Sequence, residues 1–288
     1  MGYTCLMQNF LPPTIRIGAV HLYASQPTTL AAFYQHTIGM DMLGEAGDTL
    51  LLGVSGRPLL GIHPASQPPF TGRRTGLYHQ ALLYPSRLSL ARAYRRLLNL
   101  RTPLQGASDH GVSEAIYLAD PEGNGLELYC DRKPQDWPRA TDGSLQMFTY
   151  SLDLEELLSE DDAATSRPHV DHQTRVGHVH LQVVDIKECV HFYTDIIGFD
   201  IVQRYGNMAV FVSAGGYHHH LAMNVWQGAG ASTPPVGSPG LAWFEISGVS
   251  LAAVRHRLEV AGWAFKDLLP GGLSTRDPSG NGLIFQGE

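Results

Sequence analysis

The sequence predicts an α+β fold built from four βαβββ modules arranged in two halves. Each predicted module begins with a strand, continues with a helix and ends with short strands separated by glycine-rich turns. This order occurs twice before residue 131 and resumes after a stretch of different composition. Motifs of the first half also return in the second half at a constant spacing, which is typical of an internal repeat.

The first predicted repeat covers residues 14–131 and contains two modules. Apolar and β-forming residues bounded by glycine and turn residues indicate strands over 16–24, 42–62, 76–84, 112–118 and 126–130. Apolar residues at helical spacing indicate helices over 27–38, which ends before Gly39, and over 88–98.

Residues 132–173 lack this periodicity and are predicted to form a linker with one or two helical turns at most. The second predicted repeat, 174–288, restores the pattern. It has predicted strands over 176–183, 208–225 and 241–246, and predicted helices over 186–197 and 251–261.

The repeat is visible in single residues. A constant offset of 159 positions (177 − 18) relates Gly18, His21, Phe33, Tyr34, Gly39 and Asp41 to Gly177, His180, Phe192, Tyr193, Gly198 and Asp200. The turn Asp120-Pro-Glu-Gly-Asn-Gly-Leu126 also recurs as Asp277-Pro-Ser-Gly-Asn-Gly-Leu283. We interpret these turns as structural, because both copies are present and only the first precedes a glutamate, Glu127.

Composition argues against nucleic acid binding and against a membrane-spanning protein. The chain has 288 residues and a net charge of −7 without a strong basic run, which argues against a nucleic acid partner. No apolar run reaches the roughly 18 residues that a membrane span needs. The three cysteines are scattered, and residues 1–13 lack the pattern of a signal peptide, so we expect a cytoplasmic protein without disulfides.

With these motifs, the chain resembles the vicinal oxygen chelate superfamily, which contains glyoxalase I, extradiol dioxygenases and bleomycin resistance proteins. The resemblance implies two cup-shaped mixed sheets, each made of two modules and able to hold a divalent metal. The segments Gly76–His79, Val112–Tyr117 and Gly216–His220 make the chain most similar to bacterial two-repeat catechol 2,3-dioxygenases.

The extradiol signature matches His110, Ile116-Tyr117, Asp120-Pro-Glu-Gly123 and Glu127. It departs at Ser108, where the signature usually has Gly, Asn, Thr, Ile or Val. In this family two histidines and one carboxylate hold Fe(II) and leave positions open for a catecholate and O₂.

The resemblance places the histidine ligands on the first strands of paired modules. The aligned positions are Ala19, His79, His178 and Trp243, and the last strands of modules two and four offer Glu127 and Ile284. Only modules two and three together supply a complete set, His79, Glu127 and His178. We therefore hypothesise that these modules form the working cup. Because His180 shares a strand face with His178, either could be the ligand, and we favour His178.

Other histidines receive roles from the same resemblance. His220 is expected to act as acid or base, while Tyr117 and His110 are expected to hydrogen-bond the bound catecholate. His180 and His218 are expected to contact the substrate. Strand alternation would point His219 away from His218 and His220, which favours a structural role for it.

The function implied is an Fe(II)-dependent extradiol dioxygenase acting on catechol or a substituted catechol, with Mn(II), Zn(II) or Ni(II) as other metals that the site could take. The expected partners are a small aromatic diol and O₂, with homo-oligomers possible. Two alternatives remain open: a metal-dependent lyase or isomerase of the glyoxalase type, and a non-catalytic binder of the same fold. The lyase would need a second carboxylate in the cup.

Overall fold

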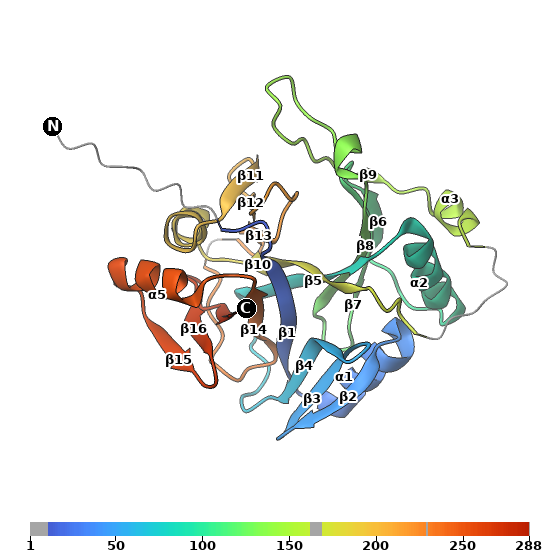
Figure 1. The fold of residues 1–288 in the computed structure, drawn as a ribbon. Coiled ribbons are helices and arrows are strands. Elements are labelled where there is room, and N and C mark those ends of the chain that lie inside the picture. Colours follow the sequence, from blue (N-terminus) through green and yellow to red (C-terminus); the bar gives the residue numbers. More distant parts are fainter. Residues whose placement is uncertain (1–10, 162–168, 229, 288) are drawn as a thin grey trace.

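The computed structural model describes residues 11–161, 169–228 and 230–287 of the chain (Figure 1). Within these residues the strands form two mixed sheets. The eight-stranded sheet has the order β15 (Phe265–Leu268), β16 (Gly272–Arg276), β17 (Gly282–Gln286), β14 (Gly240–Ser247), β1 (Arg16–Ala24), β4 (Arg57–Pro64), β3 (Thr49–Val54) and β2 (Asp41–Ala46). The nine-stranded sheet has the order β11 (Asp200–Tyr205), β12 (Ala209–Ser213), β13 (Leu221–Asn224), β10 (Arg175–Gln182), β5 (Gly76–Tyr84), β8 (Gly125–Asp131), β7 (Ser113–Ala119), β6 (Gly106–Asp109) and β9 (Tyr150–Ser151).

Each sheet takes one module from each half of the sequence. Modules two and three meet in the nine-stranded sheet, where β5 and β10 pair antiparallel, and modules one and four meet in the other sheet, where β1 and β14 pair antiparallel. The strand order confirms the predicted α+β fold and the hypothesis that module two pairs with module three.

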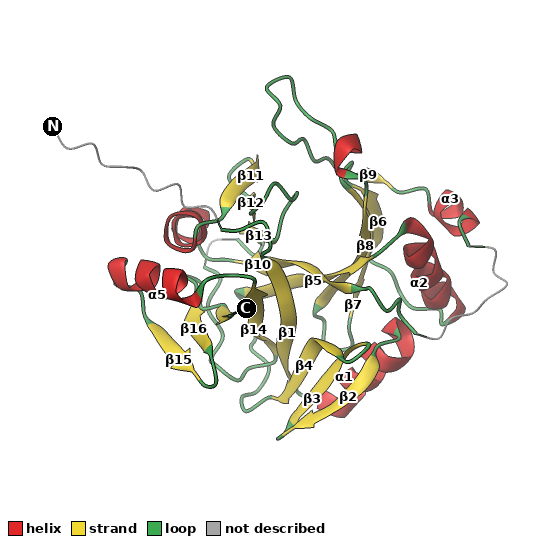
Figure 2. Ribbon diagram, viewed as in Figure 1, coloured by secondary structure: helices red, strands yellow, loops and turns green. Residues whose placement is uncertain are grey.

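The helices lie at the periphery of the molecule and the strands run through its middle (Figure 2). They are α1 (Pro27–Phe33), α2 (Arg87–Asn99), α3 (Leu154–Ser159), α4 (Ile186–Val190) and α5 (Leu251–Val260), with the 3₁₀-helix η2 (Pro134–Asp136) and the π-helices η1 (Tyr34–Ile38) and η3 (His191–Ile197). Gly39 and Gly198 follow the two π-helices with φ of 91° and 106°, which explains why glycine stands at both positions.

The repeated tyrosines and turns join the two sheets. Tyr34 donates a hydrogen bond to Asp120 Oδ2 over 3.1 Å, and Tyr193 makes the same bond to Asp277. In both turns the other carboxylate oxygen, Oδ1, accepts two backbone N–H groups. All four side chains are buried, so these bonds satisfy polar groups inside the core. The repeated motifs are therefore structural, as the sequence predicted.

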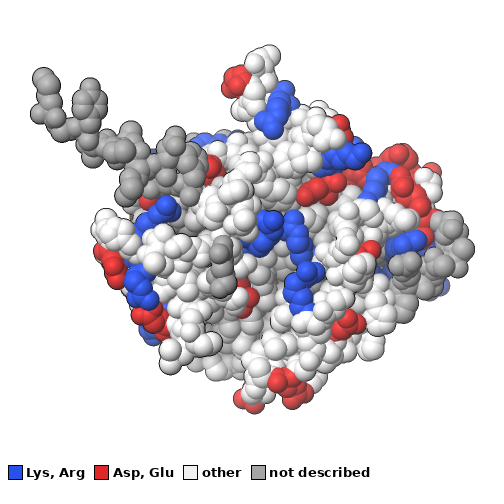
Figure 3. All heavy atoms as spheres, viewed as in Figure 1, with Lys and Arg blue, Asp and Glu red and all other residues white. Residues whose placement is uncertain are grey.

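Positive and negative side chains are interspersed on the face shown in Figure 3, without an extended surface of one sign. None of the helices in the described ranges is long and apolar enough to cross a membrane.

Candidate metal centre and active site

A cavity of about 600 Å³ lies over the nine-stranded sheet. Its walls come from both paired modules and from residues 147–149 of the segment that joins the two halves of the sequence. Histidines and aromatic side chains are prominent among the residues that line it: Tyr78, His79, His110, Tyr117, Phe148, His178, His180, Tyr205, Phe211, His219 and Trp226.

Three predicted ligands meet at the floor of this cavity. Ala81 of β5 is the paired neighbour of both Glu127 in β8 and His178 in β10, which places these two side chains on either side of one strand. His79 lies two residues before Ala81 and therefore on the same face. Its Nε2 is 3.0 Å and His178 Nε2 is 3.1 Å from the same atom, Glu127 Oε2. One ligand atom from each residue lies within 4.8 Å of the others.

These contacts fit a cation better than a hydrogen-bond network. His79 Nε2 is buried and makes no hydrogen bond despite its distance from Glu127, and His178 Nδ1 is also buried without a partner. A buried nitrogen without a hydrogen-bond partner reduces the stability of the fold unless a bound ion or ligand satisfies it. Two imidazoles and one carboxylate are the donor set typical of non-haem Fe(II).

The electrostatics of Glu127 and His178 agree with metal binding. Burial alone would raise the pKa of Glu127, but His178 and His79 hold this pKa well below its usual range. Burial lowers the pKa of His178, against the effect of Glu127. At neutral pH the carboxylate is therefore ionised and the imidazole of His178 is neutral, which are the forms that bind a metal.

His180 lines the cavity but bonds elsewhere. Asn224 accepts the Trp226 N–H with its carbonyl oxygen, so its Nδ2 faces His180 Nε2 at 3.0 Å and donates to it. His180 Nε2 is thereby occupied, whereas His178 points its Nε2 at Glu127. Of the two histidines left open by the sequence, the geometry favours His178 as the ligand.

Tyr117 and His110 form a hydrogen-bonded pair at the cavity wall. His110 Nδ1 is 2.8 Å from the Phe148 carbonyl oxygen and must donate to it, so neutral His110 accepts the Tyr117 hydroxyl at Nε2 over 2.7 Å. Burial and the nearby Glu127 raise the pKa of Tyr117 well above its usual value. Its phenol therefore stays protonated and serves as a hydrogen-bonding group.

The structure corrects the arrangement expected for the three consecutive histidines. His219 lines the cavity, with its ring centroid 4.1 Å from that of His178. His220 Nδ1 instead accepts the Ala214 N–H and lies 3.0 Å from Ser213 Oγ, and His218 bonds to Asp131. Neither His218 nor His220 is among the residues that line the cavity. The alternation rule failed because β12 ends at Ser213 and β13 begins at Leu221, so all three lie in an irregular connection.

A chain of hydrogen bonds leads from His219 to a partly exposed carboxylate. His218 Nε2 is 2.8 Å from Asp131 Oδ1, and His218 Nδ1 is 2.8 Å from His219 Nδ1. A carboxylate accepts the Nε2 proton, so in the neutral form of His218 Nδ1 carries a lone pair and His219 Nδ1 donates to it. The free lone pair of His219 is thus on Nε2.

Within the described residues, the second cup has no side chains that could bind a metal at the three equivalent positions. The positions equivalent to His178, His79 and Glu127 are Ala19, Trp243 and Ile284. His21 pairs with Trp243 across β1 and β14, as His180 pairs with His79, and the two rings stack with centroids 4.5 Å apart. The three replacements have no metal-binding side chain, which supports a structural role for this cup.

Three residues that line the cavity were not assigned to it from the sequence: Arg74, Gln203 and His219. Asn224, which bonds His180 behind the cavity wall, was not singled out either. Gln203 of β11 bonds both backbone groups of Met147, accepting N–H over 2.7 Å and donating to the carbonyl over 3.0 Å. The repeat could have indicated Asn224, because it stands where the other cup has His63, which contacts His21 as Asn224 contacts His180. Gln203 and Arg74 carry no local motif.

Comparison with known proteins relates this chain to a family. Residues 175–285 match the model of the Glyoxalase/Bleomycin resistance protein/Dioxygenase superfamily. The chain is 40% identical over 244 residues to a protein named catechol-2,3-dioxygenase from Bacillus subtilis (strain 168), covering 82% of this chain and 84% of that one.

Solved structures share the fold at low identity. A candidate dioxygenase from Bacillus subtilis subsp. subtilis str. 168 superposes with a TM-score of 0.65 at 14% identity, covering 94% of this chain and 84% of that one. Glyoxalase I from Zea mays superposes with a TM-score of 0.58 at 14% identity, covering 95% and 92%. Taken with the 40% identity above, these likenesses show that the chain belongs to the Glyoxalase/Bleomycin resistance protein/Dioxygenase superfamily.

Proposed function

We propose that this protein is an Fe(II)-dependent extradiol dioxygenase that cleaves the ring of catechol or a substituted catechol next to the diol. The observation that carries the proposal is the convergence of His79 and His178 on Glu127 at the floor of an open cavity. The relative named catechol-2,3-dioxygenase supports it independently.

His79, His178 and Glu127 would hold the metal. A ferrous ion bound there would supply the redox chemistry by which O₂ attacks the diol ring. All three ligands come from the floor of the cavity, so the rest of the cavity would be free for the two substrates. The side chains around the metal would then bind the diol, orient it and transfer its protons.

His219 is the residue that we assign to proton transfer in place of His220. Its Nε2 lone pair suits it to take a proton from a substrate hydroxyl and return one later. Tyr117 and His110 would orient the diol, since the Tyr117 oxygen donates to His110 and can still accept a hydrogen bond.

The cavity also argues against the glyoxalase type of reaction. Among the described residues that line it, Glu127 is the single carboxylate, whereas the lyase alternative needs two. A pure binding protein would have no need to bury three ligand atoms so close together. Cytoplasmic location and homo-oligomer formation stay predictions.

The proposal is tested by anaerobic reconstitution with Fe(II), followed by catechol and O₂, with the yellow ring-cleavage product as readout. We expect product from the wild type, none from Glu127→Ala, and normal product from Glu245→Ala, which removes the carboxylate beside His21 in the second cup. Absence of product with catechol and several alkyl and aryl catechols, despite bound iron, would refute the proposal. Parallel samples with Mn(II), Zn(II) and Ni(II) show whether activity requires iron.

A further inference from the structure

The cavity is larger than the diol alone requires. Its volume of about 600 Å³ lies within the range of pockets that enclose ligands of several connected rings or chains. A single-ring diol on the metal ligands would fill one end of it. Arg74, two residues before β5, and Gln227 also line the cavity.

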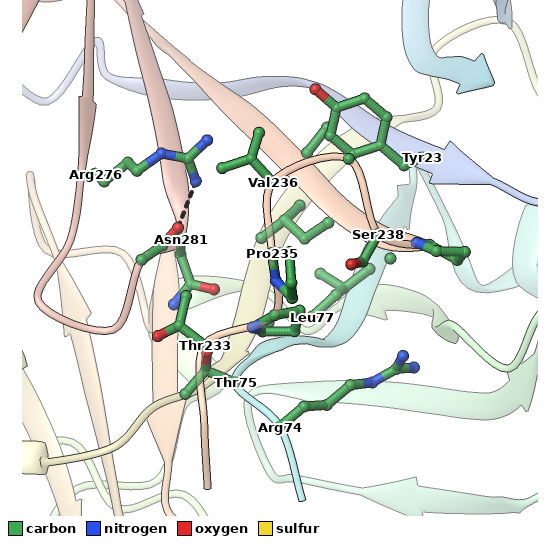
Figure 4. Close-up of a pocket in the computed structure, with 18 of the residues that line it drawn as sticks. Tyr23, Arg74, Thr75, Leu77, Thr233, Pro235, Val236, Ser238, Arg276 and Asn281 are labelled. Atoms are coloured by element: carbon green, nitrogen blue, oxygen red, sulfur yellow. Dashed lines mark hydrogen bonds between the residues drawn. The ribbon is translucent and has the colours of Figure 1, made fainter. Parts of the chain in front are cut away.

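Arg74 is an unusual residue for such a wall. Among the described residues that line the cavity it is the single Lys or Arg, and Glu127 is the single Asp or Glu. The side chain is half-buried, yet within the described ranges its guanidinium makes no ion pair or hydrogen bond. Arg74 also borders a neighbouring pocket, which Figure 4 draws, and no dashed line joins it to the residues shown there. A partly desolvated cation without a partner favours binding of an anion.

The segment that carries Arg74 is fixed in place. The backbone of Arg74 forms a parallel bridge with Ser232. Next to it, the buried Thr75 donates its backbone N–H to Ser232 and its hydroxyl to the Ser279 carbonyl. These bonds hold the Arg74 backbone, so the cation is presented to the cavity from an anchored position.

The distance along the chain indicates what the anion is attached to. Arg74 and His79 are five residues apart, which is at most about 17 Å between Cα atoms in extended chain. Both residues line the cavity. An acidic group on a short side arm of the ring would extend farther from the metal ligands toward Arg74 than a carboxyl directly on the ring.

We propose that Arg74 binds a carboxylate carried on the ring substituent, so that the preferred substrate is an acidic catechol. This inference rests on the proposed function for the position of the diol. Arginine is well suited to the task because its planar guanidinium can donate two parallel hydrogen bonds to a carboxylate.

The test compares Arg74→Gln with the wild type on dihydroxyphenylpropionic acid, in both ring isomers, and on the matching methyl ester. Arg73→Gln is the matched control, since Arg73 is exposed and lies outside the cavity wall. We expect Arg74→Gln to lower kcat/KM for at least one acid isomer about tenfold, mainly through KM, and to leave the ester unchanged. Tenfold corresponds to about 1.4 kcal/mol. Arg73→Gln should leave both unchanged.

A second measurement separates this inference from the proposed function. Calorimetric binding of the same acid and ester to Zn(II)-loaded protein needs no turnover, and the Arg74→Gln loss should appear there too. Failure of every catechol to react would refute the dioxygenase, while an acid preference that depends on Arg74 in the Zn(II) form would still support the inference. Equal binding of acid and ester, or an equal loss for both in Arg74→Gln, would overturn it.

Discussion

Asp131 Oδ1 accepts a hydrogen bond from His218 Nε2 across 2.8 Å, and this contact sets the proton positions of the next histidine. Through His218, it leaves the lone pair of His219 on Nε2. Asp131 touches no residue of the metal set, so its effect on the reaction would be indirect, through the tautomer of His219.

We therefore predict that Asp131→Ala lowers kcat about tenfold or more while bound iron per chain stays the same. General acid–base catalysis raises the reaction rate about 10²–10⁴-fold, and part of this increase is lost when the proton sits on the wrong nitrogen of His219. The control is Asp136→Ala, an exposed acid nearby that carries the same charge. An unchanged kcat in Asp131→Ala would show that His219 does not depend on this chain of bonds.

Gln203→Ala should loosen the segment that closes the cavity at Met147–Thr149. The variant removes two hydrogen bonds to the Met147 backbone, each worth about 0.5–1.5 kcal/mol. We expect faster proteolysis within residues 140–150 and a severalfold higher KM, with bound metal unchanged. The exposed Gln173→Ala is the control. Equal cleavage rates in both variants would contradict a clamping role for Gln203.

Gly177→Ala should destabilise the fold by about 2–3 kcal/mol or more. A Cβ at this position would overlap the hydroxyl of Tyr129. That ring is fully buried, and its hydroxyl is held 2.8 Å from the Tyr217 hydroxyl, so it cannot yield easily. Gly271→Ala is the comparison, because a Cβ there meets no atom within 4 Å. Urea unfolding should show a lower midpoint for the first variant and little change for the second.

His220 should make the fold sensitive to acid. Burial, helped by His218, lowers its pKa to about 3, below the value of about 6.5 expected for the unfolded chain. Between these values the unfolded chain takes up a proton that the folded chain does not, so stability falls as pH falls. The loss is about 1.4 kcal/mol per pH unit.

The variant His220→Gln tests this sign. Between pH 7 and pH 4.5, the drop in unfolding free energy should be smaller than in the wild type by about 2–3 kcal/mol. Urea unfolding at several pH values measures it. Parallel curves for the two proteins would mean that His220 does not titrate on unfolding.

Much of the fold could be predicted from the sequence because the repeat places the same buried groups at the same positions. The paired Tyr34–Asp120 and Tyr193–Asp277 bonds give that repeat a physical reason. Strand alternation also predicted that His79, Glu127 and His178 come together, because it holds within β5, β8 and β10. The alternation rule failed at His219, which lies between strands. It could not predict that Arg74 lines the cavity, because Arg74 is positioned by its tertiary bridge to Ser232.

The central claim is that the cup of modules two and three holds the metal and that the cup of modules one and four does not. It is tested most directly by iron bound per chain after anaerobic reconstitution and desalting, in the wild type, His79→Ala and His21→Ala. We predict about one equivalent in the wild type and in His21→Ala, and almost none in His79→Ala. Retention of a full equivalent by His79→Ala, or its loss in His21→Ala, would contradict the account.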